Sequence, residues 1–305
     1  MQTLDSPAAL EALAKVTHIY TDLDGTLLAP GGRLLTTHHG KPSVELATCL
    51  VRLKKMGVEV VITTGRDAGS ATEIMRLLNL EQFIGEMGCV VQFGYGVTAS
   101  KHYNLGDWTT EHFDQDYNLP ASITPFEMIA RSGAVANLLH AFPGRLEEQT
   151  LKTAQREVTH ALRGDVDTSP GGEVDLLLAE QELPLQLLDN GIIHPRNHGL
   201  LHVDEIHIYH LMPRGTGKGE AIALDMATKG ITAEQVVAIG DAEGDVYMGK
   251  YSGSFVLVDD HKKNSPAAFA EATVANPAAL FTTTHPSADG WVEFAHALLK
   301  AKQES

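Results

Sequence analysis

Cysteine and basic residues are scarce in this sequence, and each shortage excludes a class of protein. Only two of the 305 residues are cysteines, Cys49 and Cys89, and neither has a partner at CxxC spacing. A disulfide framework and a zinc knuckle are therefore not expected. The 23 lysines and arginines are outnumbered by 39 aspartates and glutamates, which gives a formal charge of −16. Such a surface repels phosphate backbones, so we expect no nucleic acid as a partner.

Long apolar runs are also missing. No stretch approaches the roughly 18 consecutive apolar residues that span a bilayer. The opening residues, MQTLDSPAALEALAKVTHIY, lack the basic start and apolar centre of a signal peptide. We expect no membrane association, and we expect a cytoplasmic protein that is a monomer or a homodimer.

What the chain does contain is an alternation of short apolar runs and amphipathic segments. Apolar runs lead to Asp22 and to Gly65, and a third run, followed by a hairpin, lies within residues 83–94. Residues 41–57 and 71–80 have the apolar spacing of amphipathic helices. Strands and helices in alternation are typical of α/β proteins, so we predict a doubly wound, mostly parallel, Rossmann-like sheet.

The pattern changes in the middle of the chain. Residues from about 104 to about 205 are richer in His, Asp, Asn and Pro, and we predict a helix within 146–164 and a strand within 171–180. The strand and helix alternation resumes after this stretch. We therefore predict a core built from residues 1–103 and 206–305, with an inserted α+β cap domain at 104–205 that determines substrate specificity.

Polar residues cluster where an open α/β sheet places its ligands, at the carboxyl ends of strands. Each one alone has an ordinary structural explanation, because an Asp after a strand often caps a helix or forms a turn. Their order along the chain makes a shared site the better hypothesis. The residues are Asp22 and Asp24, then Thr64, Gly65 and Arg66, then Lys218 at a predicted helix start, and finally Asp241 and Asp245.

These residue types suit phosphoryl transfer. A carboxylate can attack phosphorus and form an aspartyl-phosphate, while a neighbouring carboxyl group protonates the departing oxygen. Mg²⁺ prefers oxygen ligands, which Asp22 and Asp241 can supply, and it offsets the crowded negative charge. The Lys218 ammonium and the Thr64 hydroxyl can hold the remaining phosphoryl oxygens.

The motifs DLDGT, TTGR, GKGEA and AIGDAEGD resemble those of the haloacid dehalogenase superfamily. The long insert between the second and third motifs is similar to that of the Cof-like branch, with sucrose-phosphate and mannosyl-phosphoglycerate phosphatases and phosphomannomutase. The resemblance implies the following roles: Asp22 as nucleophile and metal ligand; Asp24 as general acid/base and, through its carbonyl, metal ligand; Thr64 and Lys218 as phosphoryl-binding residues; Gly65 and Arg66 as substrate-binding residues; Asp241 as metal ligand; and Asp245 as a support for the metal shell or for Lys218.

The implied function is a Mg²⁺-dependent phosphatase that hydrolyses a small phosphorylated metabolite, a sugar phosphate or a phosphoglycerate-like ester, through an aspartyl-phosphate. Two alternatives remain open. A phosphomutase shares the nucleophile and the general acid/base, and a receiver-like module binds a phosphoryl group without hydrolysing metabolites. Two residues near the motifs differ from those of many members of the superfamily that the chain resembles. Gly244 and Met87 stand at positions where an Asn is common.

Histidines occur along the segment that returns from the insert. For His202, His207 and His210 we expect strand alternation or partial exposure, and not metal binding.

Overall fold

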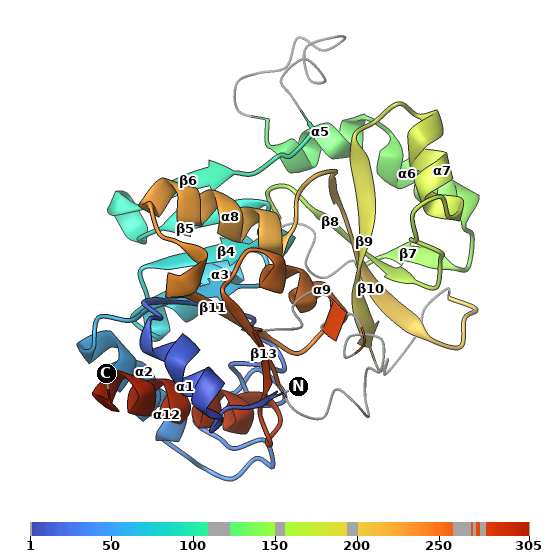
Figure 1. Ribbon diagram of the computed structural model, residues 1–305. Coiled ribbons are helices and arrows are strands. Elements are labelled where there is room, and N and C mark those ends of the chain that lie inside the picture. The colour runs from blue at the N-terminus through green and yellow to red at the C-terminus, as the bar shows by residue number, and fades with distance from the viewer. Residues whose placement is uncertain are drawn as a thin grey trace.

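The computed structural model describes residues 2–108, 123–149, 156–193, 201–258, 270, 273–274 and 279–304. A large sheet lies in one half of the molecule, where β4, β5, β6, β11 and β13 are labelled in Figure 1. It has nine strands in the order β1-β13-β12-β11-β2-β3-β4-β5-β6. Its neighbouring strands run parallel from β1 to β4, while β5 and β6 are antiparallel additions. The strands are β1 (Gln2–Thr3), β2 (His18–Thr21), β3 (Glu59–Thr63), β4 (Gln82–Gly85), β5 (Val90–Phe93), β6 (Ser100–Tyr103), β11 (Val236–Gly240), β12 (Ser254–Leu257) and β13 (Leu280–Thr282).

Helices cover both faces of this sheet, as the predicted fold class requires, and that prediction is confirmed. One face carries α1 (Pro7–Ala14), α2 (Glu45–Lys55), α3 (Ala68–Leu77) and α12 (Ser287–Glu304), and the other carries α8 (Lys218–Lys229). Strand residues alternate between the two apolar layers. Ile19 and Val60 pack toward the first group of helices, whereas Tyr20 and Val61 pack toward α8. This alternation is why the buried strands read as continuous apolar runs in the sequence.

A second sheet of four strands lies beside the first, with the order β7-β8-β10-β9 and antiparallel pairing throughout (Figure 1). Within the described residues of this region, three helices accompany it. The elements are β7 (Leu146–Glu148), β8 (His160–Gly164), β9 (Leu185–Ile193), β10 (Ile206–Pro213), α5 (Pro125–Arg131), α6 (Ala134–Ala141) and α7 (Glu173–Glu180).

The boundary predicted at residues 205 and 206 is wrong in one respect. Strand β10 begins at Ile206, and it pairs with β8 and β9 of the small sheet and not with the large sheet. An apolar strand reads the same in either sheet, so the sequence alone does not assign it. The small sheet therefore extends to Pro213.

Two secondary-structure predictions inside the insert are also wrong. The predicted helix within 146–164 contains β7 and β8 at its two ends, and residues 150–155 lie outside the described part. The predicted strand within 171–180 is helix α7, whose first turn carries Glu173 and Asp175 and whose buried residues are Val174 and Leu178. That spacing of four residues fits a helix, and acidic side chains stabilise a helix N-terminus.

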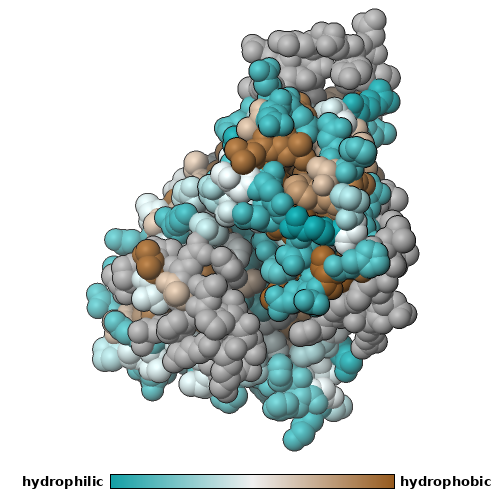
Figure 2. Space-filling view, turned by 90° about the vertical axis from the view of Figure 1, so that its right-hand side faces the viewer, coloured by the Kyte–Doolittle hydropathy of each residue, from teal (hydrophilic) through white to brown (hydrophobic). Residues whose placement is uncertain are grey.

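The other core elements named for the described residues are short. They are the 3-10 turns η1 (Glu86–Gly88), η2 (Gly96–Thr98), η4 (Ala233–Gln235) and η5 (Tyr247–Lys250), and the single-turn helix α9 (Glu243–Val246). Among the residues that Figure 2 colours on this face, hydrophilic ones predominate and hydrophobic ones form small separate areas. Among the helices that the structure describes, none is both long and apolar enough to cross a membrane.

Candidate active site

The candidate site lies where β2, β3 and β11 end side by side. The Asp22 N–H donates to the Ile239 carbonyl at 2.9 Å, which ties the residue after β2 to strand β11. Just before it, the Thr21 hydroxyl accepts a hydrogen bond from Trp291 Nε1 at 3.1 Å, and Trp291 is fully buried in α12. The end of β2 is thus fixed from two directions before any ligand is present.

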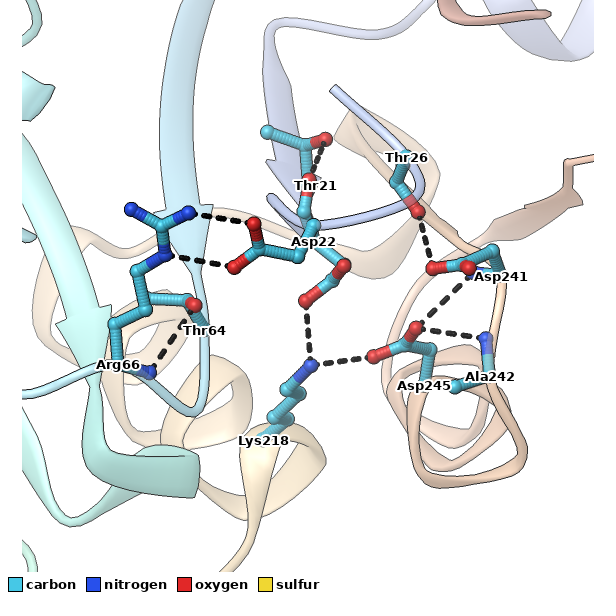
Figure 3. Close-up of polar contacts among 10 residues, drawn as sticks. Thr21, Asp22, Thr26, Thr64, Arg66, Lys218, Asp241, Ala242 and Asp245 are labelled. Atoms are coloured by element: carbon cyan, nitrogen blue, oxygen red, sulfur yellow. Dashed lines mark hydrogen bonds and ion pairs between the residues drawn. The ribbon is translucent and has the colours of Figure 1, made fainter. Parts of the chain in front are cut away.

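Lys218, the first residue of α8, lies between two carboxylates (Figure 3). Its Nζ donates to Asp22 Oδ1 at 2.7 Å and to Asp245 Oδ1 at 2.5 Å. All three side chains are buried. Burial alone lowers the pKa of Lys218, but attraction to Asp22 and Asp245 outweighs it, so the pKa lies above its ordinary value and the amine stays charged.

Asp22 is only 6% exposed. Burial raises the pKa of its carboxyl group to about 7, and repulsion by Asp245 and Asp24 adds to this, while Lys218 acts in the opposite direction. A buried carboxylate so placed is stabilised by any further cation that enters the site.

Asp241 and Asp245 complete the acidic cluster from the end of β11. Asp245 Oδ2 accepts the backbone N–H groups of Asp241 and Ala242, both at 3.0 Å, which folds the loop around its carboxylate. The Thr26 hydroxyl donates to Asp241 Oδ1 at 2.8 Å. One carboxylate oxygen from each of Asp22, Asp241 and Asp245 lies within 4.8 Å of the others. Burial and repulsion by Asp22 and Asp245 raise the pKa of Asp241 well above its ordinary value.

Gly25 is required by the geometry of the turn after Asp24. Its φ is +89°, and a methyl group added to it would lie 2.3 Å from Asp241 Oδ2. Only glycine tolerates both the left-handed backbone and this close approach. The DGT sequence therefore brings the first turn directly against Asp241.

The Asp24 side chain points away from the acidic cluster and toward Arg66. Arg66 Nε and Nη2 donate to its two oxygens at 2.7 and 2.5 Å. This bidentate geometry is the strongest form of the arginine–carboxylate contact. The Asp24 carboxylate is thus not part of the three-carboxylate cluster, whereas the Asp245 carboxylate, predicted only as a support, is part of it.

Thr64 and Gly65 follow β3 on the opposite side of Asp22 from β11. The Thr64 N–H donates to the Ile84 carbonyl at 2.8 Å, and its hydroxyl accepts the Arg66 N–H at 3.2 Å. Thr64 is 2% exposed. These bonds fix the turn that carries Gly65 and Arg66.

The cluster fits a hard divalent cation. Three carboxylates offer oxygen donors within a small radius, and among the described residues the only charged donor bonded to them is Lys218. Mg²⁺ binds such oxygen ligands and reduces the mutual repulsion of the carboxylates. Asp22, Asp241 and Asp245 are the residues that could hold it.

Three residues of this neighbourhood did not emerge as site residues from the sequence. Thr26 was visible only as the last letter of DLDGT. His210 and Asn190 belong to strands of the small sheet, and a methyl group on Gly65 would lie 3.3 Å from His210 Nε2 and 3.2 Å from Asn190 Nδ2. His207 is partly exposed, as expected, whereas His210 is buried. Because side chains alternate along a strand, His207 and His210 point to opposite faces of the small sheet. The alternation alone does not show which of these two faces meets the core.

Comparison with known proteins supports the motif assignment. The sequence pattern of haloacid dehalogenase-like hydrolases matches residues 19–105 and 200–276, which is more than half of the chain. A phosphoglycolate phosphatase of Halobacterium salinarum is 33% identical over 146 residues, covering 45% of this chain and 63% of that protein. The chain thus spans less than two thirds of this relative's length.

Solved structures share the fold over almost the whole chain. A sucrose-phosphatase of Synechocystis sp. PCC6803 has a TM-score of 0.58 at 17% identity, covering 92% of this chain and 97% of that one. A haloacid dehalogenase-like hydrolase of Bacteroides thetaiotaomicron has a TM-score of 0.55 at 16% identity, covering 93% and 99%. At this identity the likeness concerns the fold. The superfamily predicted from the four motifs is confirmed, and the chain belongs to the haloacid dehalogenase-like hydrolases.

Proposed function

We propose that the protein is a Mg²⁺-dependent phosphatase that hydrolyses a small phosphorylated metabolite through an aspartyl-phosphate on Asp22. The observation that carries the proposal is the buried Lys218 ammonium between Asp22 and Asp245, at hydrogen-bond distance from both. A buried cation between carboxylates at the ends of two adjacent strands suits a dianionic phosphoryl group. The phosphatase names of relatives in the same family agree with it.

In the first step Asp22 attacks phosphorus. Lys218 holds Oδ1, and among the described residues no hydrogen bond is donated to Oδ2, so Oδ2 is the attacking atom. The Oδ2–P bond forms as the ester P–O bond breaks. Asp24, in its protonated form, gives its proton to the departing oxygen, so the alcohol leaves neutral and Asp24 becomes a carboxylate.

In the second step water attacks the aspartyl-phosphate. Asp24 takes a proton from this water, the new P–O bond forms, and the Oδ2–P bond breaks. Inorganic phosphate leaves and Asp22 is again a carboxylate. For Asp24 to reach the leaving oxygen, its ion pair with Arg66 has to open, and a substrate phosphoryl group is an alternative partner for the guanidinium.

The acidic cluster has a role beside this chemistry. When Mg²⁺ is bound by Asp22, Asp241 and Asp245, it supplies positive charge that offsets the phosphoryl oxygens and the carboxylates. Lys218 and the Thr64 hydroxyl bind the phosphoryl oxygens, and Thr26 holds the Asp241 carboxylate in place.

We assign the small sheet and its helices, which lie within 123–213, to a cap over this site. All the proposed catalytic residues lie outside that range. Arg156, which precedes β8, donates from Nη2 to the Gly65 carbonyl at 3.0 Å, so the small sheet is joined directly to the catalytic turn. An inserted lid that admits a metabolite and then limits water is a common device in phosphoryl transfer.

The test is phosphate release from a panel of sugar phosphates, phosphoglycerates and p-nitrophenyl phosphate, with Mg²⁺ and after chelation. We expect release only with the metal, and we expect Asp22→Asn to abolish it while circular dichroism and the melting temperature show a folded protein. Isomerised product without free phosphate would indicate a mutase. Full activity of Asp22→Asn, with deamidation excluded by mass spectrometry, would contradict the nucleophile assignment.

A further inference from the structure

Helix α8 is hydrogen-bonded at two levels to the chain segment that carries Asp22. At the site, Lys218 Nζ donates to Asp22 Oδ1 at 2.7 Å, and further down the helix Asp225 Oδ2 accepts the Tyr20 hydroxyl at 2.6 Å. Tyr20 lies two positions before Asp22, so in extended backbone the two side chains point to the same face of the sheet. About two helical turns separate Lys218 from Asp225, which places both on the same side of α8. The two hydrogen bonds therefore connect one face of the sheet with one side of the helix.

The lower of these two contacts belongs to a buried polar network. Tyr20 is fully buried and Asp225 is 3% exposed. Lys229 Nζ, at the end of α8, lies 3.0 Å from Asp225 Oδ2. It also donates to Glu59 Oε1 of β3 and to Gln82 Oε1 of β4, both at 2.6 Å. The end of α8 that is remote from the site is thus tied to β2, β3 and β4.

This network lies in an otherwise apolar layer. Ala221, Ile222 and Met226 of α8 are buried there together with Val61 of β3. Apolar contacts are non-directional, so they hold the helix on the sheet without fixing its position along its own axis. A hydrogen bond is directional and fixes that position. Burying a carboxylate costs free energy, and Asp225 Oδ1 has no hydrogen bond within the described part of the chain, so the network serves specificity better than it serves stability.

The axial position of α8 matters because Lys218 is its first residue. The hydrogen bonds from Lys218 Nζ to Asp22 and to Asp245 are 2.7 and 2.5 Å long. A displacement of Nζ by about 1 Å away from both carboxylates lengthens them beyond roughly 3.2 Å, the upper end of the normal range. The same displacement moves the ammonium group away from the attacking carboxylate.

We propose that Tyr20 and Asp225 are positioning residues, and that their hydrogen bond sets the position of α8 along its axis and thereby the position of Lys218 Nζ at Asp22. The effect on catalysis rests on the proposed phosphatase activity. The displacement of Nζ does not depend on it.

The kinetic experiment separates positioning from stability with two variants. In Tyr20→Phe/Asp225→Leu both polar groups become apolar, so neither is left buried without its partner, and we expect a melting temperature close to that of the wild type. With Mg²⁺, kcat/KM should nonetheless fall at least about tenfold for whichever phosphate ester of the panel above the wild type hydrolyses best. In Asp225→Asn the amide oxygen can accept the Tyr20 hydroxyl as Oδ2 does, so kcat/KM should stay within about threefold of the wild type.

Crystal structures of the wild type and of the apolar double variant measure the displacement directly. We expect Lys218 Nζ to lie at least about 1 Å further from Asp22 Oδ1 in the variant. Tyr209→Phe is the matched control for loss of a buried tyrosine hydroxyl. Tyr209 is 1% exposed, and its hydroxyl bonds only to the Val166 backbone among the described residues of the small-sheet region, so the variant should keep the wild-type kcat/KM.

The outcomes distinguish this inference from the proposed function. Absence of phosphate release from every substrate of the panel overturns the phosphatase, and the crystal structures then decide on α8 alone. In the apolar variant, a wild-type kcat/KM or an Nζ in its wild-type place overturns the positioning role. An equally large loss of kcat/KM in Asp225→Asn or in Tyr209→Phe also overturns it, because activity would then follow stability. Should the apolar variant not fold, as judged by its melting curve, Tyr20→Phe replaces it with the same expected results.

Discussion

At the scale of single residues, the site depends on how closely its residues approach one another as much as on their charges. Gly25 and Asp241 are more than two hundred positions apart in the sequence, yet a methyl group on Gly25 would lie 2.3 Å from Asp241 Oδ2. The motif letters alone indicate that a glycine is present. They do not indicate that its missing side chain leaves room for a carboxylate of another strand.

Gly25→Ala should therefore damage the site and the fold together. The φ of +89° strains an alanine, at about 1–2 kcal/mol, and the methyl group displaces Asp241. We expect phosphate release to fall about 100-fold or more, as for a misplacement of about 1 Å. Gly57→Ala is the control, because its φ is +75° with open space around it. Equal activity losses in both variants would show that strain, and not the approach to Asp241, is responsible.

Arg66→Lys tests whether the guanidinium passes from Asp24 to the substrate phosphoryl group. An ammonium group cannot make the paired contact that the guanidinium makes with both Asp24 oxygens, nor the same paired contact with two phosphoryl oxygens once the Asp24 pair has opened. We expect kcat to fall by about 10- to 100-fold with the melting temperature nearly unchanged. Arg145→Lys, which disrupts a similar two-pronged pair with Glu173 in the small-sheet region, should leave kcat at the wild-type value. An unaltered kcat in Arg66→Lys would remove Arg66 from the site.

At the scale of elements, prediction from sequence succeeds in the core and fails in the insert. Core strands such as β2 and β11 are buried on both faces, so their apolar runs and the glycine or aspartate that follows identify them. Helix α8 carries its own signals, from Lys218 after a glycine to the left-handed Gly230. The site motifs follow these elements and were found with them.

The insert lacks such local signals. Strand β8 is stabilised by pairing with β7 and with β10, and β10 lies more than forty residues further along the chain. In β8, the His160 side chain points toward the helices that accompany the small sheet, whereas the neighbouring Ala161 points toward the core. The pairing with the distant strand β10 determines which of the two side chains points in which direction. The closeness of His210 and Asn190 to Gly65 was missed for the same reason, since no local pattern specifies which face of the small sheet meets the core.

Turn η1 and the loop before β8 form one hydrogen-bonded unit, and Glu86→Gln tests it. The buried Glu86 carboxylate accepts the N–H groups of Glu157, Val158 and Thr159 at 2.7 to 3.1 Å. An amide offers one acceptor oxygen and adds two donors with no partner there, so we expect the free energy of unfolding to fall by about 2–3 kcal/mol.

Chemical denaturation measures this loss. Glu157→Gln is the control, because its side chain only joins Lys101 and Tyr103 near the surface, and it should change the free energy of unfolding by less than about 1 kcal/mol. Equal effects of the two substitutions would mean that Glu86 does not hold the small sheet to the core.

At the scale of the whole molecule, stability should depend on pH through buried neutral histidines. Burial lowers the pKa of His160 to about 4, from 6.5, although its bond to the Phe126 carbonyl at 2.8 Å opposes this. The folded pKa lies below the unfolded one, so the unfolded chain binds the proton first. The contribution of His160 to the free energy of unfolding is constant above pH 6.5 and declines as the pH falls from there toward 4. At pH 4.5 this decline amounts to about 2 kcal/mol.

Unfolding free energies at pH 7.5 and 4.5, for the wild type and for His160→Gln, test this dependence. The variant should lose less stability on acidification than the wild type, by about that amount. The same loss in both proteins would assign the acid sensitivity to other groups.

The strand order of the large sheet has a consequence for biosynthesis. Strand β2 lies between β3, which follows it soon in the chain, and β11, which is made last of the three. Every strand of the small sheet leaves the ribosome before β11 does. A growing chain therefore carries a complete cap beside a core whose β2 edge is still unpaired, a surface open to mispairing or to a chaperone. It also carries Asp22 and Lys218 without Asp241 and Asp245, so the three-carboxylate cluster is incomplete until β11 and the loop after it have been translated and folded into place.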